Sequence, residues 1–312
     1  MTYDQISMRD AFGQTLAQLA QENEEIYYLA ADTVKSMGGA LMAKEFPDRG
    51  RNVGIAEQNM MLMASGMASC GAKVFVATYA VFASMRALEQ VRTFIAYPKL
   101  DVKVIAGLGG ITGGIEGATH QGTEDIGIMR NIANMVVVSA ADAASTKVIT
   151  RAIADYKGPV YLRIGRNPFE QVFDENYRFE IGKANVMLEE GSDACIICHG
   201  VVTARCLAAA KVLKEKGIGV RLIEMPTIKP IDREAILSAA AECKNILTVE
   251  DHNIIGGLGG AVAEVLAEAG MGKLKRMGIP DCYGQSGTDE ELLGYFGLTV
   301  DGIVNAVEEF IK

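Results

Sequence analysis

Several features that carry chemistry in other proteins are scarce or missing in this sequence. It has no tryptophan and only three histidines, His120, His199 and His252. These histidines lie far apart and show no metal-ligand spacing with cysteines or acids, so we expect no zinc or iron site in this chain. A G-x-S-x-G elbow and a Walker-type phosphate loop are also missing, which argues against serine hydrolases and P-loop nucleotidases.

Long apolar runs and basic runs are missing as well. No stretch supplies the run of about 20 apolar residues that a membrane helix needs, and the start, MTYDQISMRDAF, lacks the pattern of a secretory signal. With a net charge of −9 and no Lys/Arg-rich segment, we expect neither a membrane nor a nucleic acid as partner. The six cysteines are scattered through predicted core elements. This is typical of reduced thiols, so we expect a cytoplasmic protein.

What the sequence does contain is a regular alternation of helix and strand patterns. Its 312 residues, 49% of them hydrophobic, are enough for two domains. Strands that are apolar throughout, such as MVVVS at 135–139, indicate parallel strands covered by helices on both faces. Residues 167–191 interrupt the alternation with proline, asparagine, acidic and aromatic residues. We predict an α/β protein with two α/β domains and mainly parallel sheets, at 1–170 and 191–312, joined by a linker at 171–190.

One carboxylate, Glu57, stands at the head of an almost wholly apolar stretch, EQNMMLMASGMASCGA. No further charge follows it until Lys73. A buried carboxylate is costly unless another group pairs with it or protonates it. The pattern therefore predicts a specific partner for Glu57.

Two polar segments follow predicted strand ends, which is where ligands bind in open α/β sheets. The glycine-rich stretch GLGGITGGIEGATHQGTED contains Glu116 and His120, and VYLRIGR supplies Arg163 and Arg166. The arginines could hold a phosphate or carboxylate by bidentate bonds, or form one salt bridge and one solvated side chain. A solvated surface loop is the alternative for the glycine-rich stretch.

Residues 80–96, AVFASMRALEQVRTFIA, have the pattern of one helix. Tyr79 and Phe82 lie three residues apart at its start, so they could form one aromatic face. Aromatic residues at this spacing are also common in ordinary cores, and the pattern alone leaves both interpretations open.

Six segments together resemble the carboxyl-terminal portion of transketolase, in the family's order and at similar spacing. They are GIAEQNM, TYAVFASMRALEQVR, GIEGATHQGTED, LRIGR, TIKPID and LTVEDH. The resemblance covers essentially the whole chain. It implies a thiamine-diphosphate pyrimidine-binding domain followed by a transketolase C-terminal-like domain. It also shows one residue inserted between Tyr79 and Arg86.

The resemblance implies a catalytic role for Glu57. In the family, the glutamate at this position bonds N1′ of the cofactor's aminopyrimidine and so drives formation of the carbanion at the thiazolium ring. The chemistry belongs to the cofactor, while the protein supplies one acid in a dry pocket, here walled by neighbouring methionines such as Met60, Met61 and Met63. Tyr79 and Phe82 would line the pyrimidine ring, with Phe75 as a further candidate.

The same match implies a sugar-phosphate site. His120 would contact oxygens of the donor sugar near the reacting carbon, and Glu116 would lie close to the substrate hydroxyls. Arg166 would clamp the sugar phosphate together with Ser36. The family usually has aspartate at the position of Glu116, so the extra methylene here could alter which donor is accepted.

One family motif is missing, namely G-D-G followed by a downstream asparagine, which binds Mg²⁺ and the diphosphate. The chain therefore resembles the second subunit of a split transketolase, an enzyme of pentose phosphate metabolism that transfers a two-carbon ketol unit between sugar phosphates. We expect it to be active only with a diphosphate-binding (N-terminal) partner subunit, which would bind Mg²⁺. Two copies of each chain would form a hetero-oligomer with thiamine diphosphate at the interface.

Three alternatives remain open on sequence grounds. A 1-deoxyxylulose-5-phosphate synthase shares THQG and the arginine, but it usually comes as one long chain. The β subunit of the first component of a 2-oxo-acid dehydrogenase also carries the glutamate but needs no sugar-phosphate clamp, so His120 and Arg166 favour ketol transfer. The third is a non-catalytic, regulatory α/β binding module in which Glu57 is only a structural acid.

Overall fold

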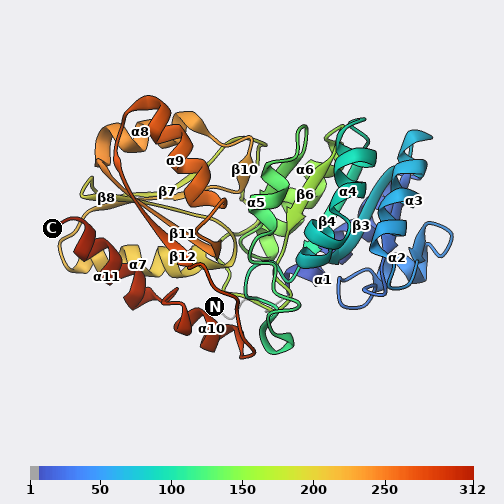
Figure 1. Cartoon of the computed structure of the whole chain (residues 1–312), viewed down its shortest axis with the longest axis horizontal. Helices are drawn as coiled ribbons and strands as arrows, with labels where there is room; N and C mark the ends of the chain where they lie inside the picture. Colours follow the sequence, from blue (N-terminus) through green and yellow to red (C-terminus); the bar gives the residue numbers. More distant parts are fainter. Residues whose placement is uncertain (1–6) are drawn as a thin grey trace.

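The computed structural model describes residues 7–312 and places them in two α/β lobes (Figure 1). The first lobe is built on a seven-stranded sheet in the order β10-β5-β6-β4-β3-β1-β2. All neighbouring strands are parallel except β10, which pairs antiparallel with β5. The strands are β1 (Ile26–Ala30), β2 (Gly50–Asn52), β3 (Lys73–Tyr79), β4 (Val102–Gly107), β5 (Val136–Ser139), β6 (Val160–Arg163) and β10 (Thr227–Lys229).

The second lobe contains a five-stranded sheet in the order β12-β11-β8-β9-β7. Here β7 is an antiparallel edge strand and the other pairs are parallel. The strands are β7 (Asn185–Glu189), β8 (Ala194–Cys198), β9 (Val220–Glu224), β11 (Asn245–Asn253) and β12 (Lys273–Ile279). Both sheets confirm the predicted α/β class with mainly parallel strands.

Helices cover both faces of the first sheet because alternate strand residues point to opposite sides. In β1, Tyr28 packs in the core that contains Phe12, whereas Leu29 packs in the core that contains Met60. The helices of this lobe are α1 (Met8–Glu22), α2 (Ala40–Glu45), α3 (Glu57–Ser69), α4 (Leu88–Gln90), α5 (Asp125–Arg130) and α6 (Ala143–Asp155).

The helices of the second lobe start at polar caps in several places. Thr288 and Glu291 form a capping box at the start of α10, and Thr299 caps α11. The helices are α7 (Thr203–Glu215), α8 (Arg233–Cys243), α9 (Leu258–Ala269), α10 (Asp289–Tyr295) and α11 (Val300–Phe310). Within residues 7–312, every helix is too short or too polar to cross a bilayer.

A buried ion-pair network joins the two lobes at the end of β6. The guanidinium of Arg163 donates to Asp251 of β11 over 2.7 Å and to Asp125 of α5 over 3.1 Å. Tyr161 also donates its hydroxyl to Asp125, over 2.7 Å. Burial raises the pKa of Asp251 to about 6, although Arg163 opposes this shift. Arg163 is thus a structural residue that ties the lobes together, and it is unavailable to a ligand.

Residues 80–96 do not form the single α-helix that the sequence pattern predicts. Two π-helical segments, Phe82–Arg86 and Val91–Ala96, flank the short helix α4. The amide of Ala87 donates to the carbonyl of Phe82, five residues earlier, over 3.1 Å. A π turn contains one residue more than an α turn, so it is the form that the insertion implied by the resemblance would take.

Candidate functional site

Glu57 is the first residue of α3, and its side chain is only 2% exposed. One nitrogen of Arg86, Nη1, donates to both carboxylate oxygens, over 2.9 Å to Oε1 and 3.0 Å to Oε2. The positive end of the helix dipole further favours an acid at this position. The partner predicted for the buried acid is thus present within the chain, but the sequence analysis did not identify Arg86 as that partner.

The methionines after Glu57 divide between two environments. Met60 and Met61 are completely buried in the core beneath α3, whereas Met63 is 39% exposed. Residues 60, 61 and 64 face the sheet because of the helical period, and residue 63 falls at the flank of that face. The apolar surroundings therefore come from Met60 and Met61, and Met63 does not join them.

Three rings from two motifs meet beside this acid. Tyr79 ends β3, Phe82 begins the first π-helical segment, and His120 lies in the glycine-rich loop. Their ring centroids are 5.8 Å apart for Tyr79 and Phe82, 5.8 Å for Tyr79 and His120, and 5.4 Å for Phe82 and His120. Tyr79 donates its hydroxyl to Ser36 over 3.2 Å. The structure thus brings together four of the residues singled out by sequence.

Phe75 lies elsewhere. Its side chain is completely buried on the α1 side of the first sheet, with its ring centroid 6.4 Å from that of Phe12. Phe75 and Tyr79 differ by four, so they point to the same face of β3, the face covered by α1, but they lie about 13 Å apart along the strand. The structure therefore places Phe75 in the hydrophobic core and not among the three rings.

One glycine lets the glycine-rich loop, which carries His120, pack closely against the residues before the first π-helical segment. A Cβ atom on Gly122 would lie 2.7 Å from the Cβ of Ala80, immediately before the first π-helical segment. Gln121 donates its amide to the carbonyl of Gln285 in the second lobe, over 3.0 Å. The loop that carries His120 is therefore held from both lobes.

Arg166 and Ser36 both line a cavity of about 670 Å³ that also contains Tyr79, Lys35 and Arg9. Arg166 forms an ion pair with Glu116, and both side chains are about one-third exposed. Because a guanidinium carries five N–H donors, Arg166 can bind an anion while it keeps one bond to Glu116. The cavity therefore combines basic groups with the edge of the ring cluster.

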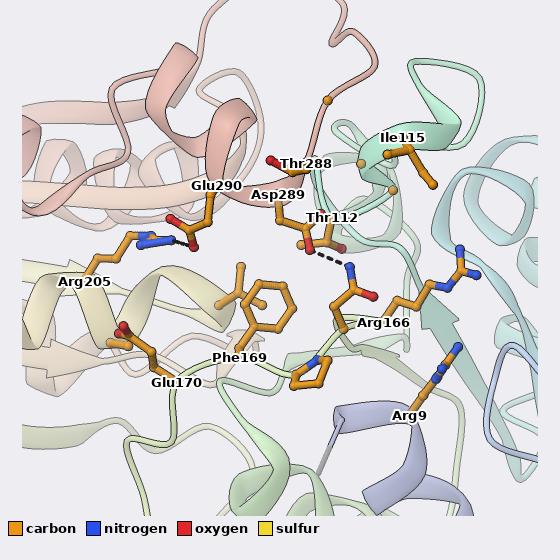
Figure 2. Close-up of a pocket in the computed structure, with 17 residues that line it drawn as sticks. Arg9, Thr112, Ile115, Arg166, Phe169, Glu170, Arg205, Thr288, Asp289 and Glu290 are labelled. Carbon is orange, nitrogen blue, oxygen red and sulfur yellow. Dashed lines mark hydrogen bonds and ion pairs between the residues drawn. The ribbon is translucent and has the colours of Figure 1, made fainter. Parts of the chain in front are cut away.

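Arg9 is a candidate that the sequence analysis missed. It lies in the first turn of α1 and lines the cavity just described as well as a neighbouring cavity of about 560 Å³. In Figure 2, Arg9 and Arg166 project toward the same side of this second cavity. A basic residue in a first helical turn opposes the helix dipole, and that is the signal that could have drawn attention to Arg9.

The second cavity lies between the lobes. Asn167 donates its amide to Asp289 over 2.7 Å, and Arg205 pairs with Glu290 (Figure 2). Burial raises the pKa of Asp289. The start of α10 thus contacts the segment that follows β6 and helps to fix the loop that bears Arg166.

The arrangement suits the pyrimidine half of a thiamine cofactor. A buried acid next to an aromatic face can pair with a ring nitrogen and hold the ring flat. Within residues 7–312, no group of three or more histidine, cysteine, aspartate or glutamate side chains is placed to hold a metal ion.

Models of two protein families match the chain. The pyrimidine-binding domain of transketolase matches residues 4–171, and the transketolase C-terminal domain matches residues 182–303. Together the two models cover most of the sequence.

Individual proteins give the same picture. A Methanocaldococcus jannaschii protein, named provisionally as a transketolase C-terminal section, is 47% identical over 98% of this chain and 96% of its own length. The 6-deoxy-6-sulfo-D-fructose transketolase subunit of a Clostridium species is 38% identical over 97% of this chain and 94% of its own. A solved structure titled as a split gene transketolase, inactive beta4 tetramer, has a TM-score of 0.91 at 43% identity and covers 98% of both chains.

Proposed function

This chain belongs to the transketolase family, and we propose that it is the pyrimidine-binding subunit of a split enzyme that works only with a diphosphate-binding partner. The family implies a thiamine-diphosphate-dependent transfer of a two-carbon ketol unit between sugar phosphates. The observation that carries this proposal is the position of Glu57, a buried acid beside the rings of Phe82, Tyr79 and His120.

Each side chain of the site then has a defined task. When bound, thiamine diphosphate supplies the nucleophilic carbon that takes up the ketol unit. Glu57 shares a proton with N1′ of the pyrimidine, and Phe82 and Tyr79 orient that ring. His120, which faces both rings, donates to oxygens of the donor sugar. The apolar core under α3 keeps water away from the acid.

The basic cavity next to the rings suits the phosphate of the sugar. Arg166 and Arg9 supply guanidinium groups, and Ser36 supplies a hydroxyl. Planar guanidinium groups match phosphate oxygens by paired hydrogen bonds. We propose that Arg166 holds the phosphate while Glu116, its ion-pair partner, bonds a substrate hydroxyl.

A partner subunit is proposed because the chain contributes only one half of a cofactor site. Large apolar side chains are exposed on α3, on the two π-helical segments and on the residues next to these elements, namely Ile55, Leu62, Met63, Met85, Phe94 and Tyr97. Such residues commonly mark a surface that another chain covers. We propose that the partner supplies the ligands for Mg²⁺ and the diphosphate and that two copies of each chain assemble. The related β4 tetramer is titled inactive, which agrees with this division of labour.

We also propose that the protein works in the cytoplasm. All six of its cysteines are free thiols, and this is the usual state in a reducing compartment.

The test combines the chain with its partner, thiamine diphosphate, Mg²⁺, xylulose 5-phosphate and an aldose phosphate. We expect ketol transfer by the mixture and a loss of at least about a hundredfold in Glu57→Gln, because the acid takes part in proton transfer. Undiminished transfer by the variant would contradict the role of Glu57. Turnover by the isolated chain would contradict the split assembly. Condensation of pyruvate with glyceraldehyde 3-phosphate would favour the 1-deoxyxylulose-5-phosphate synthase alternative.

A further inference from the structure

Arg86 contacts two groups of the site, the carboxylate of Glu57 and the ring of Phe82. Its Nη1 donates to both oxygens of Glu57, and its Cζ lies 4.2 Å from the centroid of the Phe82 ring. A guanidinium is planar and stacks on aromatic faces. Arg86 therefore pairs with the buried acid through its edge and covers the neighbouring ring with its face.

Those are the two contacts that the proposed function assigns to the aminopyrimidine. We propose that Arg86 is a stand-in for the cofactor: in the unassembled chain it fills the pyrimidine position, and it leaves Glu57 when the cofactor binds. The proposal rests on the proposed function, because only a pyrimidine-binding role makes Glu57 and Phe82 a ligand site.

The isolated chain needs such a stand-in for a physical reason. Glu57 is buried, and a buried carboxylate without a partner strongly destabilises a fold. Before the partner subunit and the cofactor arrive, Arg86 is the cation that pairs with this acid. It therefore stabilises the half-site until the pyrimidine replaces it.

Arg86 can also leave without disturbing the core. Its side chain is 46% exposed, whereas Glu57 is 2% exposed. By contrast, Arg163 pairs with buried acids from a side chain that is itself only 3% exposed. The guanidinium of Arg86 reaches inward from the surface, so rotation of its side chain returns it to solvent.

The two partners of Glu57 exclude each other. The guanidinium of Arg86 bonds both carboxylate oxygens and covers the Phe82 ring, so it occupies the space in which a pyrimidine ring would meet the acid. Arg86 must move before Glu57 can act on the cofactor.

The π-helical segment explains why Arg86 reaches this position. Phe82 and Arg86 are its first and last residues. Residues four apart lie on the same side of a helical segment, so the guanidinium is held over the ring. Short π segments inside helices are frequent at functional sites, which agrees with a role for this one.

The test compares Arg86→Met with wild type in two measurements. Methionine has a similar length and packs well on an aromatic ring but carries no charge. We expect the melting temperature of the isolated chain to fall, because Glu57 loses its partner. The apparent dissociation constant for thiamine diphosphate is measured by calorimetry with the partner chain and saturating Mg²⁺. We expect it to fall about tenfold in Arg86→Met, because no arginine then competes with the cofactor for the site.

Two further variants define the cause. Arg86→Lys should lower the melting temperature less than Arg86→Met does, because lysine still pairs with Glu57 as a point charge. It should also raise cofactor affinity less than Arg86→Met does, although lysine does not stack flat on Phe82. Arg233→Met, at the start of α8 in the second lobe, is the matched control, since Arg233 is 52% exposed and pairs with Glu268, which is itself exposed. It should change neither measurement.

A purely structural arginine would not produce both a lower melting temperature and tighter cofactor binding when it is replaced. Weaker cofactor binding in Arg86→Met would show that Arg86 is a ligand of the bound cofactor, which overturns the proposal. Unchanged binding would overturn it too. If the methionine variant does not fold, the lysine variant decides by the same criteria. Failure of the proposed function is distinguishable, because wild type itself would then neither bind thiamine diphosphate nor transfer ketol units with the partner.

Discussion

Replacement of Arg163 by methionine tests the structural role of the ion-pair network between the lobes. In wild type, the guanidinium bonds Asp251 through both the side chain, over 2.7 Å, and the main-chain carbonyl, over 2.9 Å, and it bonds Asp125 over 3.1 Å. Arg163→Met leaves Asp251 and Asp125 buried without their cation. Only Asp125 keeps another donor, the hydroxyl of Tyr161.

The expected loss of unfolding free energy is about 3–5 kcal/mol near pH 7, the usual cost of removing one partner from a buried pair. The loss should be smaller at pH 5. Burial already raises the pKa of Asp251 to about 6, and without Arg163 the folded state can hold a proton on this acid. A protonated Asp251 is neutral, so below its folded pKa the missing cation costs less.

Urea unfolding of the isolated chain at pH 5 and pH 8 measures both effects. Arg166→Met is the matched control from the same LRIGR segment. It removes an ion pair with Glu116 that is partly exposed, so it should cost less than about 1 kcal/mol. If Arg163→Met is no more destabilising than Arg166→Met, or if its effect does not depend on pH, the network does not hold the lobes as described.

Three other outcomes follow from the same contacts. Phe82→Ala should weaken thiamine diphosphate binding about tenfold through loss of ring stacking, whereas Phe75→Ala should destabilise the core by about 3–5 kcal/mol and leave that affinity unchanged; calorimetry and urea unfolding separate the two. Arg166→Ala should raise KM for phosphorylated sugars much more than for unphosphorylated ones, and equal changes would exclude a phosphate contact. Burial raises the pKa of Glu224, which accepts from Tyr177, to about 8. Its raised folded pKa gives stability that is full below about pH 4.5 and is lost as pH rises through 8. In Glu224→Gln, the urea midpoint should fall less between pH 6 and 9 than in wild type. An unchanged slope would show that the decline does not come from Glu224.

The fold class was accessible from sequence because apolar strands and amphipathic helices are local patterns. Tyr79, Phe82 and His120 were singled out through the resemblance to transketolase and not through local patterns. They meet in the structure because β4, the strand before the loop of His120, lies next to β3 in the sheet. Ligand-facing residues at adjacent strand ends meet at one edge of a parallel sheet.

The contacts of Arg86 and Arg9 were not accessible in this way. Arg86 and Glu57 are 29 residues apart in the sequence and meet through tertiary packing, which local periodicity does not predict. Arg9 reaches the cavity of Arg166 through packing of α1 beside the end of the sheet, which links residues far apart in sequence. Phe75 shows the opposite case, because proximity in sequence to Tyr79 does not give proximity in space on a strand.

The strand β10 makes the two lobes depend on each other in a way that a linker alone would not. It follows β9 of the second sheet, yet it pairs antiparallel with β5 and forms the edge of the first. A fragment that stops at residue 170 would lack this strand and would leave the backbone of β5 open as an edge, next to the apolar run Val136–Ser139. Open apolar edges pair with other chains. Exchange of the pyrimidine-binding half between enzymes, by evolution or by engineering, must therefore carry residues 227–229 along with it.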